Sequence, residues 1–69
     1  MQLTPRNSEE QAMLDIMEMR GFGLIRDKGG RQLILTTPDG SGFAVQLFPY
    51  HSDIQCVFAC FETLNTHYT

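Results

Sequence analysis

The spacing of hydrophobic residues near the start of the chain predicts an amphipathic helix. Ser8 followed by Gln11 has the spacing of a capping box, and Gly21 stands where a left-handed residue would end the helix. At about 100° per residue the apolar side chains share one arc of the helix, and this arc comprises Ala12, Met13, Leu14, Ile16 and Met17. We therefore expect Ser8 to be the N-cap of a helix that runs to about Arg20, after a polar lead-in over residues 1–7.

Three later segments alternate apolar and polar residues, which predicts strands. They cover residues 22–27, 31–36 and 42–48, with turns at Lys28-Gly29-Gly30 and Pro38-Asp39-Gly40. Short turns between neighbouring strands predict an antiparallel meander. Alternation assigns one set of side chains to the core, namely Leu24, Leu33, Leu35, Phe43, Val45 and Leu47. The other face receives Ile25, Gln32, Ile34, Thr36, Ala44, Gln46 and Phe48.

The last segment fits two kinds of element. It is rich in residues that favour strands, yet its apolar residues repeat at helical spacing, as Ile54, Val57, Phe58, Phe61 and Leu64 show. Ser52 and Gln55 repeat the capping-box pattern. We predict a helix from about Asp53 to Leu64, with a fourth strand as the alternative.

The predicted order of elements is α-β-β-β-α. It indicates a single small α+β domain over residues 8–65, in which two helices cover one face of a three-stranded antiparallel sheet. Residues 66–69 form a C-terminal tail. A chain of 69 residues has room for one core and no second domain.

The composition changes this picture in two ways. With 42% hydrophobic residues, no apolar run near the roughly 20 residues of a membrane span and no apolar leader, the chain is expected to be a cytoplasmic globular protein without membrane contact. Cys56 and Cys60 are too few for a disulfide framework or a zinc knuckle, so we interpret them as small, partly buried hydrophobic residues. A redox or metal role is the alternative, and we expect neither a cofactor nor a metal.

Charge is unevenly distributed along the chain. The formal net charge of −3 argues against a nucleic-acid-binding protein, because phosphate attraction dominates such binding. Four of the five basic residues nevertheless lie close together, at Arg20, Arg26, Lys28 and Arg31. The first helix instead gathers the acidic residues Glu9, Glu10, Asp15 and Glu18. This pattern predicts a basic tip on an acidic body.

A short motif follows the first predicted helix and suggests a family. It consists of Gly21-Phe22, Arg26 and the turn Lys28-Gly29-Gly30, and the third strand then ends in Pro49-Tyr50-His51. With the order α-β-β-β-α, this motif resembles the HicA-type RNA-cleaving toxins, whose fold is like that of double-stranded-RNA-binding domains. The resemblance runs from about Gln11 to Leu64.

One departure from the HicA pattern changes what the resemblance implies. The family has serine and histidine after the hairpin glycine, and that histidine is tied to RNA cleavage, whereas this chain has Gly30 and Arg31. Arginine stays protonated and cannot act as a general base, although it can hold a phosphate through two hydrogen bonds. The resemblance therefore implies the fold, a partner antitoxin and a relic of RNA binding rather than ribonuclease activity.

The histidines offer little for catalysis. His51 lies beside Tyr50 and near Asp53, so it could form a base with an orienting carboxylate, or it could be an ordinary loop histidine. His67 lies near the C-terminus, and no serine or cysteine nucleophile has a recognisable spacing to either histidine. We predict no enzyme and no catalytic residue.

Three groups of residues are candidate contact sites. Ile25, Ile34 and Phe48 would form an apolar patch with a polar rim on the outer sheet face, which is typical of a protein contact or a homodimer surface. The acidic residues of the first helix (Glu9, Glu10, Asp15 and Glu18) are a second candidate surface for a partner. Arg26, Lys28 and Arg31 are possible phosphate contacts.

Two functions fit these observations. The first is a small non-enzymatic binding protein that inhibits or regulates a larger partner, with phage or mobile-element proteins that block host defence nucleases such as CRISPR complexes as an example. The partner is then a protein, in one case a nucleic-acid-processing complex. The alternative is a HicA-like toxin or RNA-binding relic directed at RNA.

Overall fold

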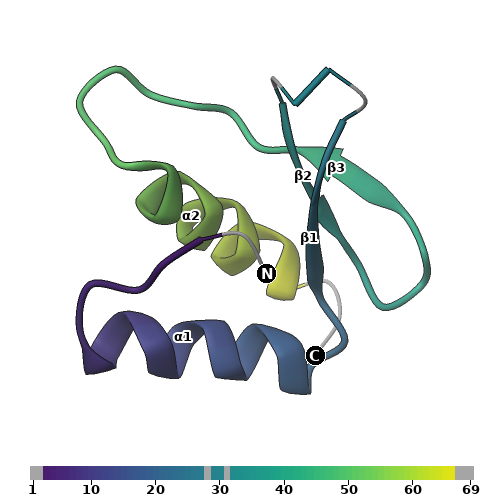
Figure 1. Ribbon diagram of the computed structural model, residues 1–69. Helices are drawn as coiled ribbons and strands as arrows, with labels where there is room; N and C mark the ends of the chain where they lie inside the picture. The colour runs from purple at the N-terminus through teal and green to yellow at the C-terminus, as the bar shows by residue number, and fades with distance from the viewer. Residues whose placement is uncertain (1–2, 28, 31, 67–69) are drawn as a thin grey trace.

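The chain folds as a helix, three antiparallel strands and a second helix, as the sequence predicts. The computed structural model describes residues 3–27, 29–30 and 32–66. Its elements are α1 (Ser8–Met19), β1 (Gly23–Arg26), β2 (Leu33–Thr36), β3 (Gly42–Ala44) and α2 (Asp53–Asn65). Figure 1 shows both helices on the same side of the sheet.

The sheet is an antiparallel meander of order β1-β2-β3. Leu35 pairs with Leu24 on one side and with Phe43 on the other. The third strand is shorter than predicted, since it ends at Ala44, although the amide of Val45 still donates to the carbonyl of Leu33 at 2.9 Å. Because β2 begins only at Leu33, no strand lies opposite the residues after Val45, and the chain leaves the sheet there.

The hydrophobic core lies between the helices and one face of the sheet. Its fully or nearly fully buried members come from both helices and from the strands, and include Leu14, Met17, Leu33, Leu35, Val45, Ile54, Val57 and Phe61. The predicted core positions Leu33, Leu35 and Val45 are confirmed, and Leu24 is half-buried. The prediction is wrong for Phe43 and Leu47, which are 40% and 48% exposed. Phe43 belongs to an edge strand, and Leu47 lies beyond the sheet.

The first helix begins one residue earlier than the capping pattern predicts. Asn7, not Ser8, is the N-cap, because its side-chain oxygen accepts from the backbone amide of Glu10 at 2.9 Å. The predicted Ser8–Gln11 capping box is therefore wrong. The C-terminal end is as predicted, since Gly21 has φ of +84° and the amide of Phe22 donates to the carbonyl of Met17 at 2.9 Å.

The second helix resolves the ambiguity of the last segment. Ser52 Oγ accepts from the amide of Gln55 at 3.3 Å, and Gln55 Oε1 accepts from the amide of Ser52 at 2.9 Å. This capping box starts α2 at Asp53, so the helix prediction is confirmed and the alternative of a fourth strand is wrong. Neither helix in the described part of the chain has the length and apolar character needed to cross a membrane.

Candidate functional site

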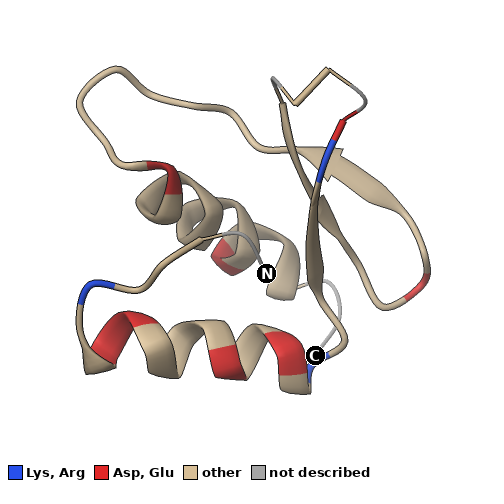
Figure 2. Ribbon diagram, in the orientation of Figure 1, with Lys and Arg blue, Asp and Glu red and all other residues tan. Residues whose placement is uncertain are grey.

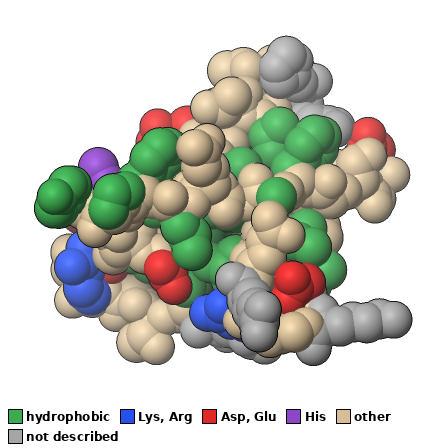
Figure 3. All heavy atoms as spheres, turned by 90° about the horizontal axis from the view of Figure 1, so that it is seen from above, with side chains coloured by type: hydrophobic (Ala, Val, Ile, Leu, Met, Phe, Trp, Pro, Cys, Tyr) green, Lys and Arg blue, Asp and Glu red, His purple; other side chains and the backbone are tan. Residues whose placement is uncertain are grey.

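Large apolar side chains are exposed along one short segment that follows β2. Seven such side chains are exposed among the described residues, and four of them fall between residues 43 and 50. We call these four the apolar strip; they are Phe43, Leu47, Phe48 and Tyr50, of which Tyr50 is 94% exposed. Figure 3 shows hydrophobic side chains exposed on one face of the molecule, some of them next to a histidine side chain. Several exposed large apolar side chains within one short segment are typical of contact sites.

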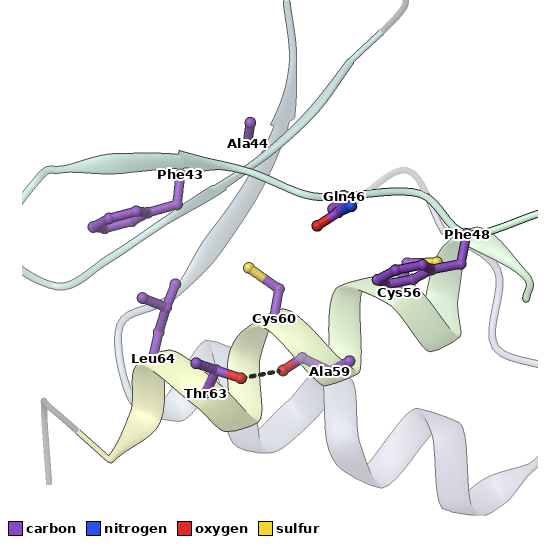
Figure 4. Close-up of a pocket in the computed structure, with 9 residues that line it drawn as sticks. All are labelled: Phe43, Ala44, Gln46, Phe48, Cys56, Ala59, Cys60, Thr63 and Leu64. Carbon is purple, nitrogen blue, oxygen red and sulfur yellow. Dashed lines mark hydrogen bonds between the residues drawn. The ribbon is translucent and has the colours of Figure 1, made fainter.

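A groove of about 330 Å³ lies beside the apolar strip, between α2 and the segment that runs from β3 to residue 48. Phe43 and Leu64 lie at one end of the groove, and Phe48 and Cys56 at the other (Figure 4). In the middle, Gln46 faces Cys60 across the groove, as Figure 4 shows. The remaining lining residues are Ala44, Ala59 and Thr63.

Two local features of the chain produce this groove. After Val45 the chain leaves the sheet and passes over α2 (Figure 1), which carries the side chains of Gln46 and Phe48 toward the helix. On its side of the groove α2 presents small residues such as Ala59 and Cys60, so the space is not filled. No residue that lines the groove is charged.

The two cysteines belong to this groove. Both are free thiols, with Cys56 buried and Cys60 half-buried. Burial raises the pKa of the Cys60 thiol above its ordinary value, so the group is protonated at neutral pH. This agrees with the interpretation of the pair as small hydrophobic residues. The described residues contain no group of three or more His, Cys, Asp and Glu side chains that could hold a metal ion.

The predicted outer patch is only partly assembled. Ile25 and Ile34 lie opposite each other in the β1–β2 ladder, where Ile25 is 51% exposed and Ile34 half-buried. Phe48 does not join them, because β3 ends before it and its ring lines the groove beside α2. Its predicted placement on the outer face is therefore wrong, whereas a role for all three residues in partner binding stays a prediction.

His51 makes an aromatic contact rather than a pair with a carboxylate. Its ring lies 5.9 Å from the ring of Phe48, centroid to centroid, with 68° between the planes. Within the described part of the chain, no hydrogen bond joins His51 to Asp53. The histidine thus extends the apolar strip, and the arrangement of a base with an orienting carboxylate is not formed.

The four acidic residues of α1 do not make one surface. Glu10 forms an ion pair with Arg6 at 3.1 Å, and this side-chain hydrogen bond holds the pKa of Glu10 below its ordinary value. Asp15 accepts from Gln11 Nε2 at 2.9 Å. Glu9 and Glu18 are exposed but lie about 180° apart around the helix axis. Figure 2 shows the acidic positions spread along the helix.

The structure describes two of the four residues that were predicted to form a basic tip, Arg20 and Arg26. Arg26 is exposed, and its Nη1 donates to the carbonyl of Gly30 at 3.5 Å, which holds the guanidinium against the hairpin turn. Lys28 and Arg31 lie outside the described residues. Arg20 is directed elsewhere, because its Nη1 donates to Asn65 Oδ1 at 3.1 Å. Phosphate contact by these residues stays a prediction.

The comparisons with known proteins leave the site to be interpreted on its own. No protein-family model, curated protein or solved structure matches the chain. The resemblance to the HicA toxins therefore stays a prediction.

The groove itself is the feature that the sequence did not reveal. The strand pattern carried the third strand to Phe48 and so placed Gln46 and Phe48 on the wrong side of the molecule. A signal was present, since residues 40–52 are the longest stretch of the chain without Asp, Glu, Lys or Arg. An uncharged run of this length extends well past a short edge strand and indicates apolar surface beyond it.

Proposed function

We propose that this chain is a non-enzymatic binding protein that inhibits or regulates a larger macromolecular partner by occupying one of its surfaces. The observation that carries the proposal is the apolar strip, in which four exposed large side chains lie within eight residues beside a groove. Aromatic side chains at such a position supply large contact area at low entropic cost, and they are frequent among the residues that dominate binding energy.

Two further observations support this function. The groove beside the strip contains a hydrogen-bonding group, the side-chain amide of Gln46, which matches the usual anatomy of an apolar site with a few polar groups. The only described histidine, His51, packs on Phe48 and has no carboxylate partner in the part of the chain that the structure describes. Protein binding requires only an exposed surface such as the apolar strip, whereas general acid–base catalysis requires a side chain positioned to transfer a proton.

The experiment is capture of partners from the native host with a tagged copy, before and after nuclease treatment. Tyr50→Ser and Phe48→Asp remove parts of the apolar strip. Met19→Ser is the matched control, because Met19 is also a large exposed apolar residue, at 85%, but lies at the end of α1. We expect a stoichiometric protein partner that is still recovered after nuclease treatment. Its recovery should fall by at least about tenfold with Tyr50→Ser and stay unchanged with Met19→Ser.

The same experiment separates the HicA-like alternative. That reading is supported by the α-β-β-β-α order and by the exposed Arg26 at the hairpin. It predicts recovery of RNA, or of a partner that is lost on nuclease treatment, with binding that weakens steeply as salt rises. Such a result would contradict the protein-binding proposal and make Arg31 and His51 the next residues to change.

A further inference from the structure

The groove runs beside an edge of the sheet that has an open row of backbone groups. Among the residues that the structure describes, the third strand of the order β1-β2-β3 pairs only with β2. The amide of Val45 donates to Leu33, and the amide of Thr37 donates to Ser41. Backbone groups alternate in direction along an antiparallel ladder, so those of Gly42 and Ala44 point away from β2. Ala44 also lines the groove, which places this row at its border.

Apart from the short length of β3, this edge lacks the features by which proteins block unwanted pairing. Exposed edge strands are usually protected by lysine, proline, inward-pointing charge or a bulge. β1, the other edge, carries Arg26. β3 consists of Gly42, Phe43 and Ala44, and no proline or charged residue occurs from Gly40 to Phe48. The edge is therefore suited to accept another strand.

Charge around the groove favours one kind of strand. All five lysines and arginines lie at or before Arg31, whereas Asp39, Asp53 and Glu62 all follow it. These three acidic residues are exposed, and each lies within four positions of a residue that lines the groove. Along the chain, the described charged residues nearest to the lining of this uncharged groove are acidic, and one basic residue, Arg20, contacts Asn65 next to Leu64. This balance of charge favours an apolar segment with basic ends. It disfavours a second copy of this chain, since two such acidic surfaces repel.

We infer that the groove and the β3 edge bind an extended, apolar segment of the partner protein, flanked by lysine or arginine, which adds to the sheet as a fourth strand. The inference rests on the proposed function and names the partner's chemistry. Main-chain hydrogen bonds to Gly42 and Ala44 supply affinity, and alternate side chains of the segment enter the groove between Phe43 and Phe48. The volume of about 330 Å³ holds side chains, not a folded element.

The first experiment is selection from a random library of nine-residue peptides displayed on phage, with the full chain as target. We expect enrichment of peptides in which apolar residues alternate over the centre and Lys or Arg flank them. The absence of enrichment would overturn the inference, as would enrichment of acidic-flanked or helix-patterned peptides. A stable dimer in analytical ultracentrifugation, lost with Ala44→Pro, would also overturn it, because the second copy would then occupy the edge.

The second experiment tests the backbone pairing with one enriched peptide made synthetically. Amide hydrogen exchange of Gly42 and Ala44 should slow by about tenfold or more on binding, because their outward amides gain a partner. The amide of Val45 is the internal control, since it already donates to Leu33 at 2.9 Å. Binding without slower exchange at Gly42 and Ala44 would show contact through side chains alone and would contradict strand addition.

Variants separate the backbone contribution from the charge contribution. Ala44→Pro removes an outward amide without removing a hydrogen bond to β2, so it should lower the affinity for the peptide by about tenfold. Ala44→Ser keeps this amide and should keep the affinity. Glu62→Gln should lower the affinity for the peptide by about twofold to fivefold at low salt. Glu18→Gln makes the same charge change on α1 and should leave the affinity unchanged. Circular dichroism spectra verify that each variant is folded. Equal effects of Ala44→Pro and Ala44→Ser would contradict the inference.

Failure of this inference is distinguishable from failure of the proposed function. A partner that is captured, and lost with Tyr50→Ser, supports the function even when no peptide protects the β3 amides. In that case the partner contacts the apolar strip with a folded surface. No protein partner at all would overturn both.

Discussion

At the scale of single residues, short-range hydrogen bonds decide where the helices begin. Asn7 and Ser8 are both good N-cap residues, and the structure uses Asn7, whose side chain accepts from the amide of Glu10. Glu10 is also held by Arg6 from the other side, through both its backbone and its guanidinium. This small network around Glu10 fixes the start of α1 one residue before the pattern of the sequence suggested.

Alanine substitution at Asn7 and at Ser8 should have different effects on the free energy of unfolding. Asn7→Ala should lower the free energy of unfolding by about 1 kcal/mol, because the amide of Glu10 loses its acceptor. Ser8→Ala should be neutral or slightly stabilising, since Ser8 is inside the helix and alanine is the better helix former. Urea unfolding followed by circular dichroism measures both. A larger loss for Ser8→Ala would show that Ser8 is the N-cap in solution and that the helix starts at Glu9.

At the scale of elements, the register of the sheet places a glycine where a side chain does not fit. Gly23 pairs with Thr36, and a Cβ atom at Gly23 would lie 2.7 Å from Thr36 Oγ1. The requirement for glycine at the start of β1 therefore comes from its partner strand and not from its own backbone angles, because its φ is not positive.

This contact predicts that the effect of Gly23→Ala on stability changes sign when Thr36 is also replaced by alanine. Gly23→Ala should destabilise the protein by about 1–3 kcal/mol, the usual effect of overpacking. In a Thr36→Ala background the crowding is absent. The same substitution should then be neutral or stabilising by up to about 1 kcal/mol, because alanine reduces the entropy of the unfolded chain. Thr36→Ala alone is the reference, and additive effects in thermal unfolding would contradict the register.

At the scale of the whole molecule, one aromatic contact joins the sheet to α2. The rings of Phe22, just before β1, and Phe61 meet edge to face, with centroids 4.9 Å apart and 89° between the planes. Both rings are nearly fully buried, at 5% and 2% exposure. A domain of this size has about 3–10 kcal/mol of stability, so a contact of this kind is a large share of the total.

Substitution of two phenylalanines tests which of these side chains belong to the core and which to the contact surface. Phe61→Ala should cost about 3–5 kcal/mol and leave much of the protein unfolded at 37 °C, because a large buried ring is replaced by a cavity. Phe43→Ala removes the same atoms from a side chain that is 40% exposed, and should cost only about 1 kcal/mol. Thermal unfolding compares the two. Similar losses would mean that Phe43 belongs to the core and not to the apolar strip.

The local pattern of the chain was enough to predict both helices, the three strands and their order. Capping at Ser52, the left-handed Gly21 and the alternation around Leu33 and Leu35 all depend on residues within a few positions of one another. For this reason the sequence also predicted the exposed Ile25 opposite Ile34. It did not reveal the groove, because alternation continues in the sequence to Phe48 after the strand itself has ended.

Periodicity and caps act between near neighbours, so the elements, their order and most of the buried face could be predicted from the sequence. The tertiary structure set where β3 stops, because a strand extends only as far as its partner, and β2 begins at Leu33. It likewise decided that Phe48 faces α2 rather than Ile25 and Ile34, and that an uncharged groove borders an open strand edge. Both outcomes depend on where a distant helix packs, which no local pattern records.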